Sequence, residues 1–188
     1  MFIETESTPN PATLKFIPGR EVLGTATADF ASAEAAASSP LAVALFELPG
    51  VVRVFLGGDF VAVTKRDHIT WQSLKPLVLG TIADHFAAGR PVIEGEGAEG
   101  DAAAEDCDPA DAEIVAQIKQ LIDTRVRPAV AGDGGDIVFR GYRDGVVRLQ
   151  MQGACSGCPS SSATLKHGVE NLLRHYVPEV KAVEQVAF

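Results

Sequence analysis

Two cysteines spaced three residues apart are the side chains of this sequence with the clearest chemical potential. Cys155 and Cys158 lie in the stretch GACSGCPSSS, residues 153–162, and the chain has one other cysteine, Cys107. Thiolates bind zinc and iron–sulfur clusters, and they attack disulfides. Because such metal sites use four ligands, the pair raises the question of where two further ligands would come from.

The residues around the pair predict a turn that leads into a helix. Pro159 disfavours helical geometry at the residue before it and suits the first position of a helix, so Cys158 is predicted to be the N-cap. The positive end of a helix dipole stabilises a thiolate. Gly153 and Gly157 allow the backbone to bend tightly. We therefore predict a reactive or metal-binding loop rather than two cysteines buried in a core.

Four interpretations of the pair are open at this point. The first is that the two thiols have no role. The second is a thioredoxin-like redox pair, although the βαβ surroundings expected of that motif are missing. The third is a structural zinc site, which would need four ligands from a chain with a single CxxC. In the fourth, two identical chains related by a two-fold axis each supply two thiolates and share an iron–sulfur cluster.

The composition argues against several classes of protein. The chain has 188 residues, 46% of them hydrophobic, and a net charge of −9, which argues against a nucleic-acid binder. The central apolar run LAVALF is far shorter than the roughly 18 residues of a membrane span. The first residues, MFIETESTPNP, match neither a secretory signal nor a transit peptide. Three cysteines favour a reducing compartment, so we predict a cytoplasmic protein of bacterial type, with a mature mitochondrial matrix form as the second possibility.

Most of the negative charge is concentrated in one segment. Eight acidic residues and no Lys or Arg lie between Glu94 and Asp111. The segment is rich in Gly and Ala and has little to bury, so residues 94–108 are predicted to be a flexible linker. Two domains are then expected, at 1–93 and 109–188. Cys107 falls in the predicted linker, where it is interpreted as a bystander rather than a ligand.

Hydrophobic periodicity predicts a small sheet with helices on one face in each domain, an α+β fold. In the first domain we expect a strand at 12–17, a helix that starts after Ser39, a hairpin at 51–65 and a helix at 71–88. The second domain is predicted to follow the order α-β-β-α-β. Its elements are a helix at 111–128 that Pro128 ends, strands at 137–140 and 146–151, a helix at 165–177 and a strand within 180–188.

The remaining candidate residues favour ordinary structural roles. The four histidines are scattered and are interpreted as partly exposed surface residues; they are His68, His85, His167 and His175. The GDGGD stretch at 132–136 lacks the Lys-Ser/Thr of a phosphate loop and precedes a strand, so it is interpreted as a tight turn. Trp71 at the head of a helix is expected to pack against a core. No Ser/His/Asp or paired-carboxylate set stands out, so the sequence does not predict an enzyme.

Residues 125–161, RVRPAVAGDGGDIVFRGYRDGVVRLQMQGACSGCPSS, resemble the C-terminal domain of NifU and the Nfu-type iron–sulfur scaffold and carrier proteins. TESTPNPATLKFIPG, LFELPGVVRVFLGGDFVAVTK and WQSLKPLVLGTI resemble the N-terminal domain of many Nfu proteins.

The resemblance implies a homodimer that bridges a [4Fe-4S] cluster, in preference to [2Fe-2S], through Cys155 and Cys158 of each subunit. It also implies transfer of the cluster to apo-proteins and supply by upstream assembly proteins. The cysteine-free N-terminal domain is assigned partner docking or stability by elimination. A thiol-disulfide oxidoreductase is the main alternative, and an adaptor that binds only apo-targets is a third.

Overall fold

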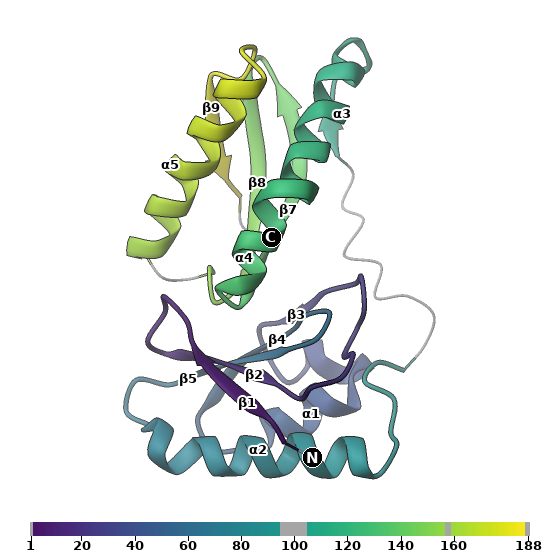
Figure 1. The fold of residues 1–188 in the computed structure, drawn as a ribbon, viewed down its shortest axis with the longest axis vertical. Coiled ribbons are helices and arrows are strands. Elements are labelled where there is room, and N and C mark those ends of the chain that lie inside the picture. Colours follow the sequence, from purple (N-terminus) through teal and green to yellow (C-terminus); the bar gives the residue numbers. More distant parts are fainter. Residues whose placement is uncertain (1, 95–104, 157–158, 187–188) are drawn as a thin grey trace. The chain divides into compact units, whose positions relative to one another are not determined.

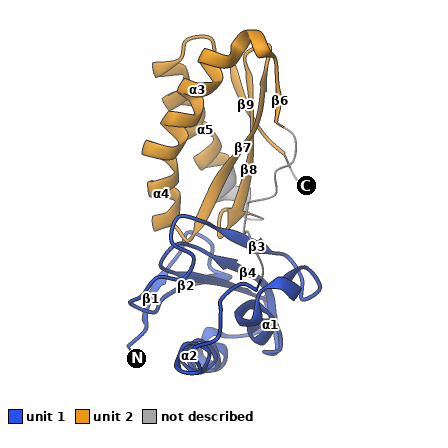
Figure 2. Ribbon diagram, turned by 90° about the vertical axis from the view of Figure 1, so that its right-hand side faces the viewer, with its two compact units in different colours: residues 1–100 blue, residues 101–188 orange. Residues whose placement is uncertain are grey.

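A computed structural model describes residues 2–94, 105–156 and 159–186. The chain divides into two compact units, residues 1–100 and 101–188 (Figures 1 and 2). Each unit contains one sheet with helices packed against it, which confirms the α+β class. The domain limits at 1–93, 94–108 and 109–188 stay a prediction, since most of the acidic segment lies outside the described residues. No helix in the described ranges is long and apolar enough to span a bilayer.

The N-terminal unit is built on a five-stranded antiparallel sheet of order β1-β2-β5-β4-β3. Its strands are β1 (Glu4–Ser7), β2 (Thr13–Ile17), β3 (Ala28–Phe30), β4 (Val51–Leu56) and β5 (Val61–Lys65). The strand at 12–17 and the hairpin at 51–65 are confirmed. β1 and β3 were not predicted, because β1 is mostly exposed and lacks apolar alternation, while β3 has only three residues.

Helices α1 (Pro40–Phe46) and α2 (Trp71–Ala87) cover one face of this sheet, and a 3₁₀ turn, η1 (Ala35–Ser38), precedes them (Figure 1). The cap at Ser39 is confirmed: its Oγ accepts a hydrogen bond from the Ala42 N–H at 3.1 Å. The same Oγ donates to the Val92 carbonyl at 2.6 Å, which ties the end of the unit to α1. Trp71 packs against the core, as expected.

One histidine departs from the surface positions predicted for all four. His68, His167 and His175 are exposed, but His85 near the end of α2 is fully buried. The ring of His85 lies edge-on to Phe86 at a centroid distance of 5.6 Å. The prediction for His85 is wrong because its position is on the inward face of α2, together with Leu74, Val78 and Ile82.

The C-terminal unit has a four-stranded sheet of order β6-β7-β8-β9. Its strands are β6 (Asp106–Cys107), β7 (Gly135–Arg143), β8 (Val146–Gly153) and β9 (Ala182–Gln185). β7 and β8 are antiparallel, whereas β6 and β9 lie parallel to their neighbours. The helical elements are η2 (Pro109–Asp111), α3 (Ala112–Leu121), a π-helical turn η3 (Ile122–Val126), α4 (Arg127–Gly132) and α5 (Pro159–Tyr176). The predicted α-β-β-α-β order is confirmed, with the short β6 added before it.

Pro128 does not end the first helix, contrary to the prediction. The helix widens into the π-helical turn η3, in which the Arg127 N–H donates to the Ile122 carbonyl, and then continues as α4. Pro128 lies in the first turn of α4, where the missing N–H is tolerated. The wider turn therefore allows a proline that a regular helix interior would not accommodate.

The end of the acidic segment is ordered against the C-terminal sheet. β6 pairs with β7 at Gly141 and Tyr142, and the Asp106 carboxylate accepts hydrogen bonds from Arg143, at 2.6 Å, and from Arg148. Glu105 accepts from Lys119 at 2.6 Å. Cys107 therefore lies in a strand of this sheet, where ion pairs and strand pairing compensate for the low apolar content of the stretch. The flexibility of the predicted linker as a whole stays a prediction.

Candidate functional site

The cysteine motif begins at the end of β8. Gly153 closes the strand with a φ of 65°, and the Ser156 N–H donates to the Gly153 carbonyl at 3.1 Å, which makes a tight turn. The Ala154 N–H donates to the Gly134 carbonyl at 3.1 Å. The turn is therefore held to the start of β7. Gly157 and Cys158, and with them the predicted N-cap, lie outside the described residues.

Cys155 lies in this turn, but its side chain is buried. It is 4% exposed and belongs to the hydrophobic cluster of the C-terminal unit. The prediction of a loop is confirmed for this residue, whereas the expectation that it avoids the core is wrong. The physical reason is Gly135, whose missing side chain leaves the space that the Cys155 Sγ occupies.

An ion pair fixes the backbone next to this turn. The Arg127 guanidinium binds Asp136 through two hydrogen bonds, Nε to Oδ1 at 2.9 Å and Nη2 to Oδ2 at 2.7 Å. Asp136 also accepts from the Ile137 N–H at 2.8 Å. The hydrogen bonds to Asp136 raise the pKa of Arg127 above its ordinary value, because they favour the charged form of the guanidinium. The pair locks α4 to the first residues of β7.

The GDGGD stretch thus has a positioning role that the sequence alone did not show. It forms a turn, as predicted, with Gly134 at a φ of 79°. Its third glycine, Gly135, opposes Gly153 across the two strands, and its second aspartate, Asp136, holds Arg127. The signal available in the sequence was two glycines, each two residues beyond a predicted strand, that a hairpin register would place opposite one another.

Cys107 and Cys155 lie at opposite ends of β7. Cys107 pairs with Tyr142, near the last residue of that strand, and packs against the hydrophobic cluster. Cys155 follows Gly153, which pairs with Gly135, the first residue of the strand. Seven residue steps along a strand correspond to about 23 Å. The structure therefore keeps Cys107 well away from Cys155.

Among the described residues, no three His, Cys, Asp or Glu side chains form a group that could hold a metal ion.

Comparison with known proteins identifies the family. The model of the Nfu/NifU scaffold protein N-terminal region matches residues 3–89, and that of the NifU-like domain matches residues 118–184. A human protein named NFU1 iron-sulfur cluster scaffold homolog, mitochondrial, is 51% identical over 99% of this chain and 72% of its own length. The chain belongs to the Nfu/NifU-like family of iron–sulfur cluster scaffold proteins. The resemblance predicted from the sequence is confirmed.

One plant relative and one insect relative agree with this assignment. NifU-like protein 5, mitochondrial, of Arabidopsis thaliana is 53% identical over 98% of this chain and 68% of its own length. The Drosophila virilis relative, named NFU1 iron-sulfur cluster scaffold homolog, mitochondrial, is 53% identical over 99% of this chain and 62% of its own length. The scaffold role of the family is thereby supported, and it is not the role of a typical enzyme.

The predicted cytoplasmic, bacterial-type location is wrong. The relatives named here are all called mitochondrial, at 51–53% identity over nearly the whole chain, which points to the mitochondrion. The error has a simple physical origin. Low cysteine content indicates a reducing compartment, and this property is shared by the cytoplasm and the mitochondrial matrix.

Proposed function

We propose that two copies of this chain hold a [4Fe-4S] cluster through Cys155 and Cys158 of each copy and pass it to apo iron–sulfur proteins. The family supplies the scaffold role, and the cysteine content of the chain supports the stoichiometry. Four thiolates make up the ligand set of such a cluster. A two-fold axis would bring two pairs together at a single site.

One observation carries this proposal: Cys107 is separated from Cys155 by nearly the full length of β7. The chain has three cysteines, so a single copy offers at most three thiolates. Thiolates that bind one cluster must lie close together, which the separation of about 23 Å along the strand excludes for Cys107. Two pairs from two chains are then the simplest source of four ligands.

Transfer follows as a ligand exchange. Thiols of an acceptor protein lose their protons and form new Fe–S bonds while the bonds to Cys155 and Cys158 break, and these protons pass to the released scaffold thiolates. No net oxidation or reduction is required. Because the Cys155 side chain is buried in the apo chain, we expect it to turn back into its place beside Gly135 after release. This return would favour departure of the cluster.

Anaerobic reconstitution with iron and sulfide assays and analytical ultracentrifugation tests the proposal. We expect about two irons and two sulfides per chain, and a shift toward dimer on loading, since a ligand that binds only the dimer stabilises it. Cys155→Ser and Cys158→Ser are expected to lose the cluster, whereas Cys107→Ser keeps it as the matched control. Four irons on a monomer, or undiminished iron in either of the first two variants, would refute the shared site.

The same experiment separates the oxidoreductase alternative and the cluster type. A colourless protein with a titratable disulfide would indicate thiol redox chemistry instead of cluster binding. About one iron per chain in the dimer would indicate a [2Fe-2S] cluster. Transfer is measured by mixing the loaded dimer with an apo-acceptor and following the iron that leaves it.

A further inference from the structure

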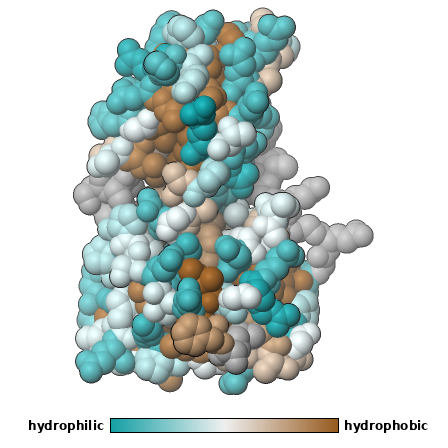
Figure 3. Space-filling model, in the orientation of Figure 1, coloured by the Kyte–Doolittle hydropathy of each residue, from teal (hydrophilic) through white to brown (hydrophobic). Residues whose placement is uncertain are grey.

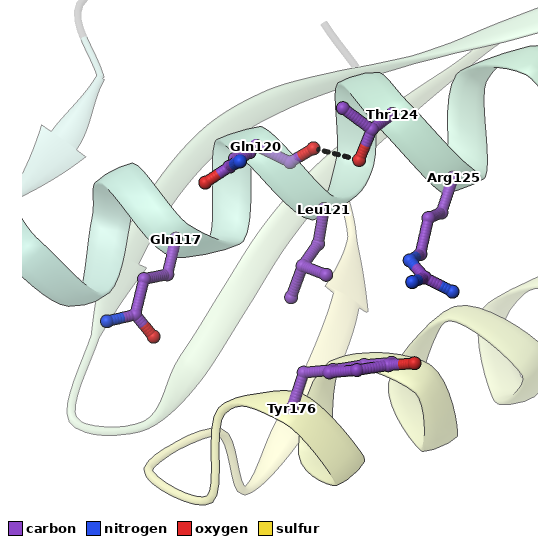
Figure 4. Close-up of a pocket in the computed structure, with 6 residues that line it drawn as sticks. All are labelled: Gln117, Gln120, Leu121, Thr124, Arg125 and Tyr176. Carbon is purple, nitrogen blue, oxygen red and sulfur yellow. Dashed lines mark hydrogen bonds between the residues drawn. The ribbon is translucent and has the colours of Figure 1, made fainter.

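In the C-terminal unit a groove lies between the continuous helix formed by α3 and η3 and the end of α5. It has a volume of about 310 Å³ and is lined by Gln117, Gln120, Leu121, Thr124, Arg125 and Tyr176 (Figure 4). Figure 3 shows hydrophobic side chains gathered on the same unit between α5 and α3. Tyr176 is 46% exposed, although it is a large aromatic residue. The groove thus offers a mixed surface, with Leu121 and Tyr176 as its apolar part and Arg125 as its charged part.

Three side chains spaced four residues apart form one wall of this groove. Gln117, Leu121 and Arg125 follow the same face of the helix, and in Figure 4 Leu121 and Arg125 point toward the Tyr176 ring on α5. In a regular α-helix, residues four apart are offset by about 40° around the axis. The π-helical turn η3 has more residues per turn, so the offset between Leu121 and Arg125 differs from that of a regular helix, and both side chains face the groove.

Arg125 has charge available for a ligand. Its Cζ lies 4.9 Å from the centroid of the Tyr176 ring, and within the described part of the chain no carboxylate forms an ion pair with it. Arg127, two residues on, is paired with both Asp123 and Asp136. A guanidinium stacked on a ring keeps the N–H groups at its edge free, and these fit a carboxylate through two hydrogen bonds.

Screening permits an acidic ligand at Arg125 although the surrounding unit is acidic. The C-terminal unit, residues 101–188, has nine Lys or Arg and 13 Asp or Glu residues, which gives it a net charge of −4, compared with −9 for the whole chain. Charges farther away than about 8 Å are largely screened at physiological salt. The acidic composition of the chain therefore does not oppose binding of a carboxylate at Arg125.

We propose that this groove binds an extended segment of a partner protein in which a carboxylate side chain follows an apolar side chain by two residues. Leu121 and Arg125 are separated by at most about 6 Å along the helix, because the π-helical turn between them rises less per residue than an α-helix, and alternate residues of an extended strand are about 6.6 Å apart. The apolar side chain packs on Leu121 and Tyr176, and the carboxylate binds Arg125. The amide of Gln117 hydrogen-bonds the backbone of the segment.

The position of the groove suits a docking site that leaves the cysteine turn accessible. α5 runs for 18 residues from Pro159 to Tyr176, so the groove lies about 25 Å from the end of the helix that follows the cysteine motif. A partner bound here would not cover Cys155. The binding chemistry goes beyond the proposed cluster function and does not depend on it.

Titration of the full-length, ¹⁵N-labelled chain with short peptides tests the groove. The probe is acetyl-Gly-Leu-Gly-Glu-Gly-amide, and one control peptide has Gln in place of Glu. A second control, acetyl-Gly-Gly-Leu-Glu-Gly-amide, has the two side chains adjacent and hence on opposite sides of an extended backbone. We expect the probe to shift the amide signals of Leu121, Arg125 and Tyr176. Both controls should bind roughly tenfold more weakly, because each loses the charge-assisted contact.

Two variants of the chain test whether Arg125 binds the Glu carboxylate of the probe peptide. Arg125→Gln should bind the Glu and Gln peptides equally. Arg174→Gln is the matched control, because Arg174 is an exposed arginine on α5 that pairs with Glu170 and does not line the groove; it should behave as the parent. The iron content of reconstituted Arg125→Gln should equal that of the parent, which separates this test from that of the cluster.

Three outcomes would overturn the proposal. The first is an absence of shifts at the groove, and the second is equal affinity of the parent for the Glu and Gln peptides. The third is self-association of the peptide-free apo chain in ultracentrifugation that Arg125→Gln abolishes, because a second copy of the chain would then occupy the groove.

Discussion

Gly135 stands directly against the thiol of Cys155. A Cβ atom on Gly135 would lie 2.9 Å from the Cys155 Sγ and 2.5 Å from the Gln152 carbonyl oxygen, closer than such atoms approach in proteins. Gly135 and Gly153 also face each other in the register of β7 and β8. The absence of a side chain at this position therefore gives Cys155 the space in which it is buried.

The first prediction is that Gly135→Ala destabilises the C-terminal unit and displaces Cys155. The backbone of Gln152 belongs to a paired strand and cannot shift without disturbing the sheet. We therefore expect a loss of about 1–3 kcal/mol in the free energy of unfolding. The thiol should also react faster with a thiol-specific reagent. Urea unfolding and the rate of thiol modification, measured in a Cys107→Ser/Cys158→Ser background where Cys155 is the only thiol, check both expectations.

Gly168→Ala serves as the matched control for that substitution. A Cβ at Gly168, within α5, would meet no atom within 4 Å. We expect it to stabilise the unit by about 0.5–1 kcal/mol and to leave the reactivity of Cys155 unchanged. If Gly135→Ala behaved in the same way, the steric role of Gly135 would be wrong.

The second prediction concerns the pair of Arg127 and Asp136. The side chain of Asp136 is 5% exposed and that of Arg127 is 35% exposed, so the pair is only partly shielded from solvent. Asp136→Asn should lower the free energy of unfolding by about 1–3 kcal/mol, less than the cost of breaking a fully buried pair. Arg127→Lys should also destabilise, because lysine lacks the planar fork that binds both carboxylate oxygens.

Asp123→Asn tests whether the effect is specific to that pair. Asp123 contacts the same guanidinium at 3.3 Å, but its side chain is 61% exposed. Thermal unfolding of the three variants should rank Asp123→Asn close to the parent. If Asp123→Asn lost as much thermal stability as Asp136→Asn, any nearby negative charge would be enough to hold α4 against β7. The buried pair of hydrogen bonds between Arg127 and Asp136 would then have no special role.

The sequence predicted the elements whose signals are local. Ser39 before Pro40 and Gly57-Gly58-Asp59 between two apolar runs fix a cap and a turn through residue chemistry alone, and both are present. The burial of Cys155 could not be predicted in this way, because it depends on Gly135, some twenty residues earlier in the chain. Long-range register decides such contacts, and a single sequence carries no direct signal of it.

The same distinction applies to the position of Cys107 and explains the error at His85. The composition of the acidic segment correctly predicts that it buries little by itself. It does not show that Arg143 and Arg148, which follow 37 and 42 residues later, form ion pairs with Asp106. For His85, the helical periodicity of α2 does place the residue on the buried face, and that signal outweighs the usual preference of histidine for the surface.

The third prediction tests the attachment of β6. Gly141 allows close approach of this strand, since a Cβ there would lie 2.7 Å from the Asp106 carbonyl oxygen. Gly141→Ala should therefore release β6 and expose the half-buried Cys107, whose modification in a Cys155→Ser/Cys158→Ser background should become faster. Gly132→Ala, with open space around its Cβ, is the control. Equal rates in the parent and Gly141→Ala would show that β6 stays in place without the glycine.

The last prediction is a pH dependence of the N-terminal unit. Burial, with a further contribution from the charge of Arg90, lowers the pKa of His85 below its ordinary value of 6.5. His85 therefore binds a proton more readily in the unfolded chain than in the folded unit. The stabilising effect of neutral His85 is fully present above pH 6.5 and is lost as the pH falls toward the lowered pKa. The slope of this loss approaches about 1.4 kcal/mol per pH unit for one proton.

The test follows the fluorescence of Trp71 during urea unfolding at several values between pH 7.5 and 5.5. Trp71 is the only tryptophan of the chain and packs against the core of the N-terminal unit, so its signal reports on that unit. His85→Leu should unfold with a clearly smaller pH slope, because the buried titrating group is gone. His68→Asn, which removes an exposed histidine, should keep the slope of the parent. A parent whose stability is flat across this range, or a His85→Leu variant with the full slope, would show that burial of His85 does not control the stability of the unit.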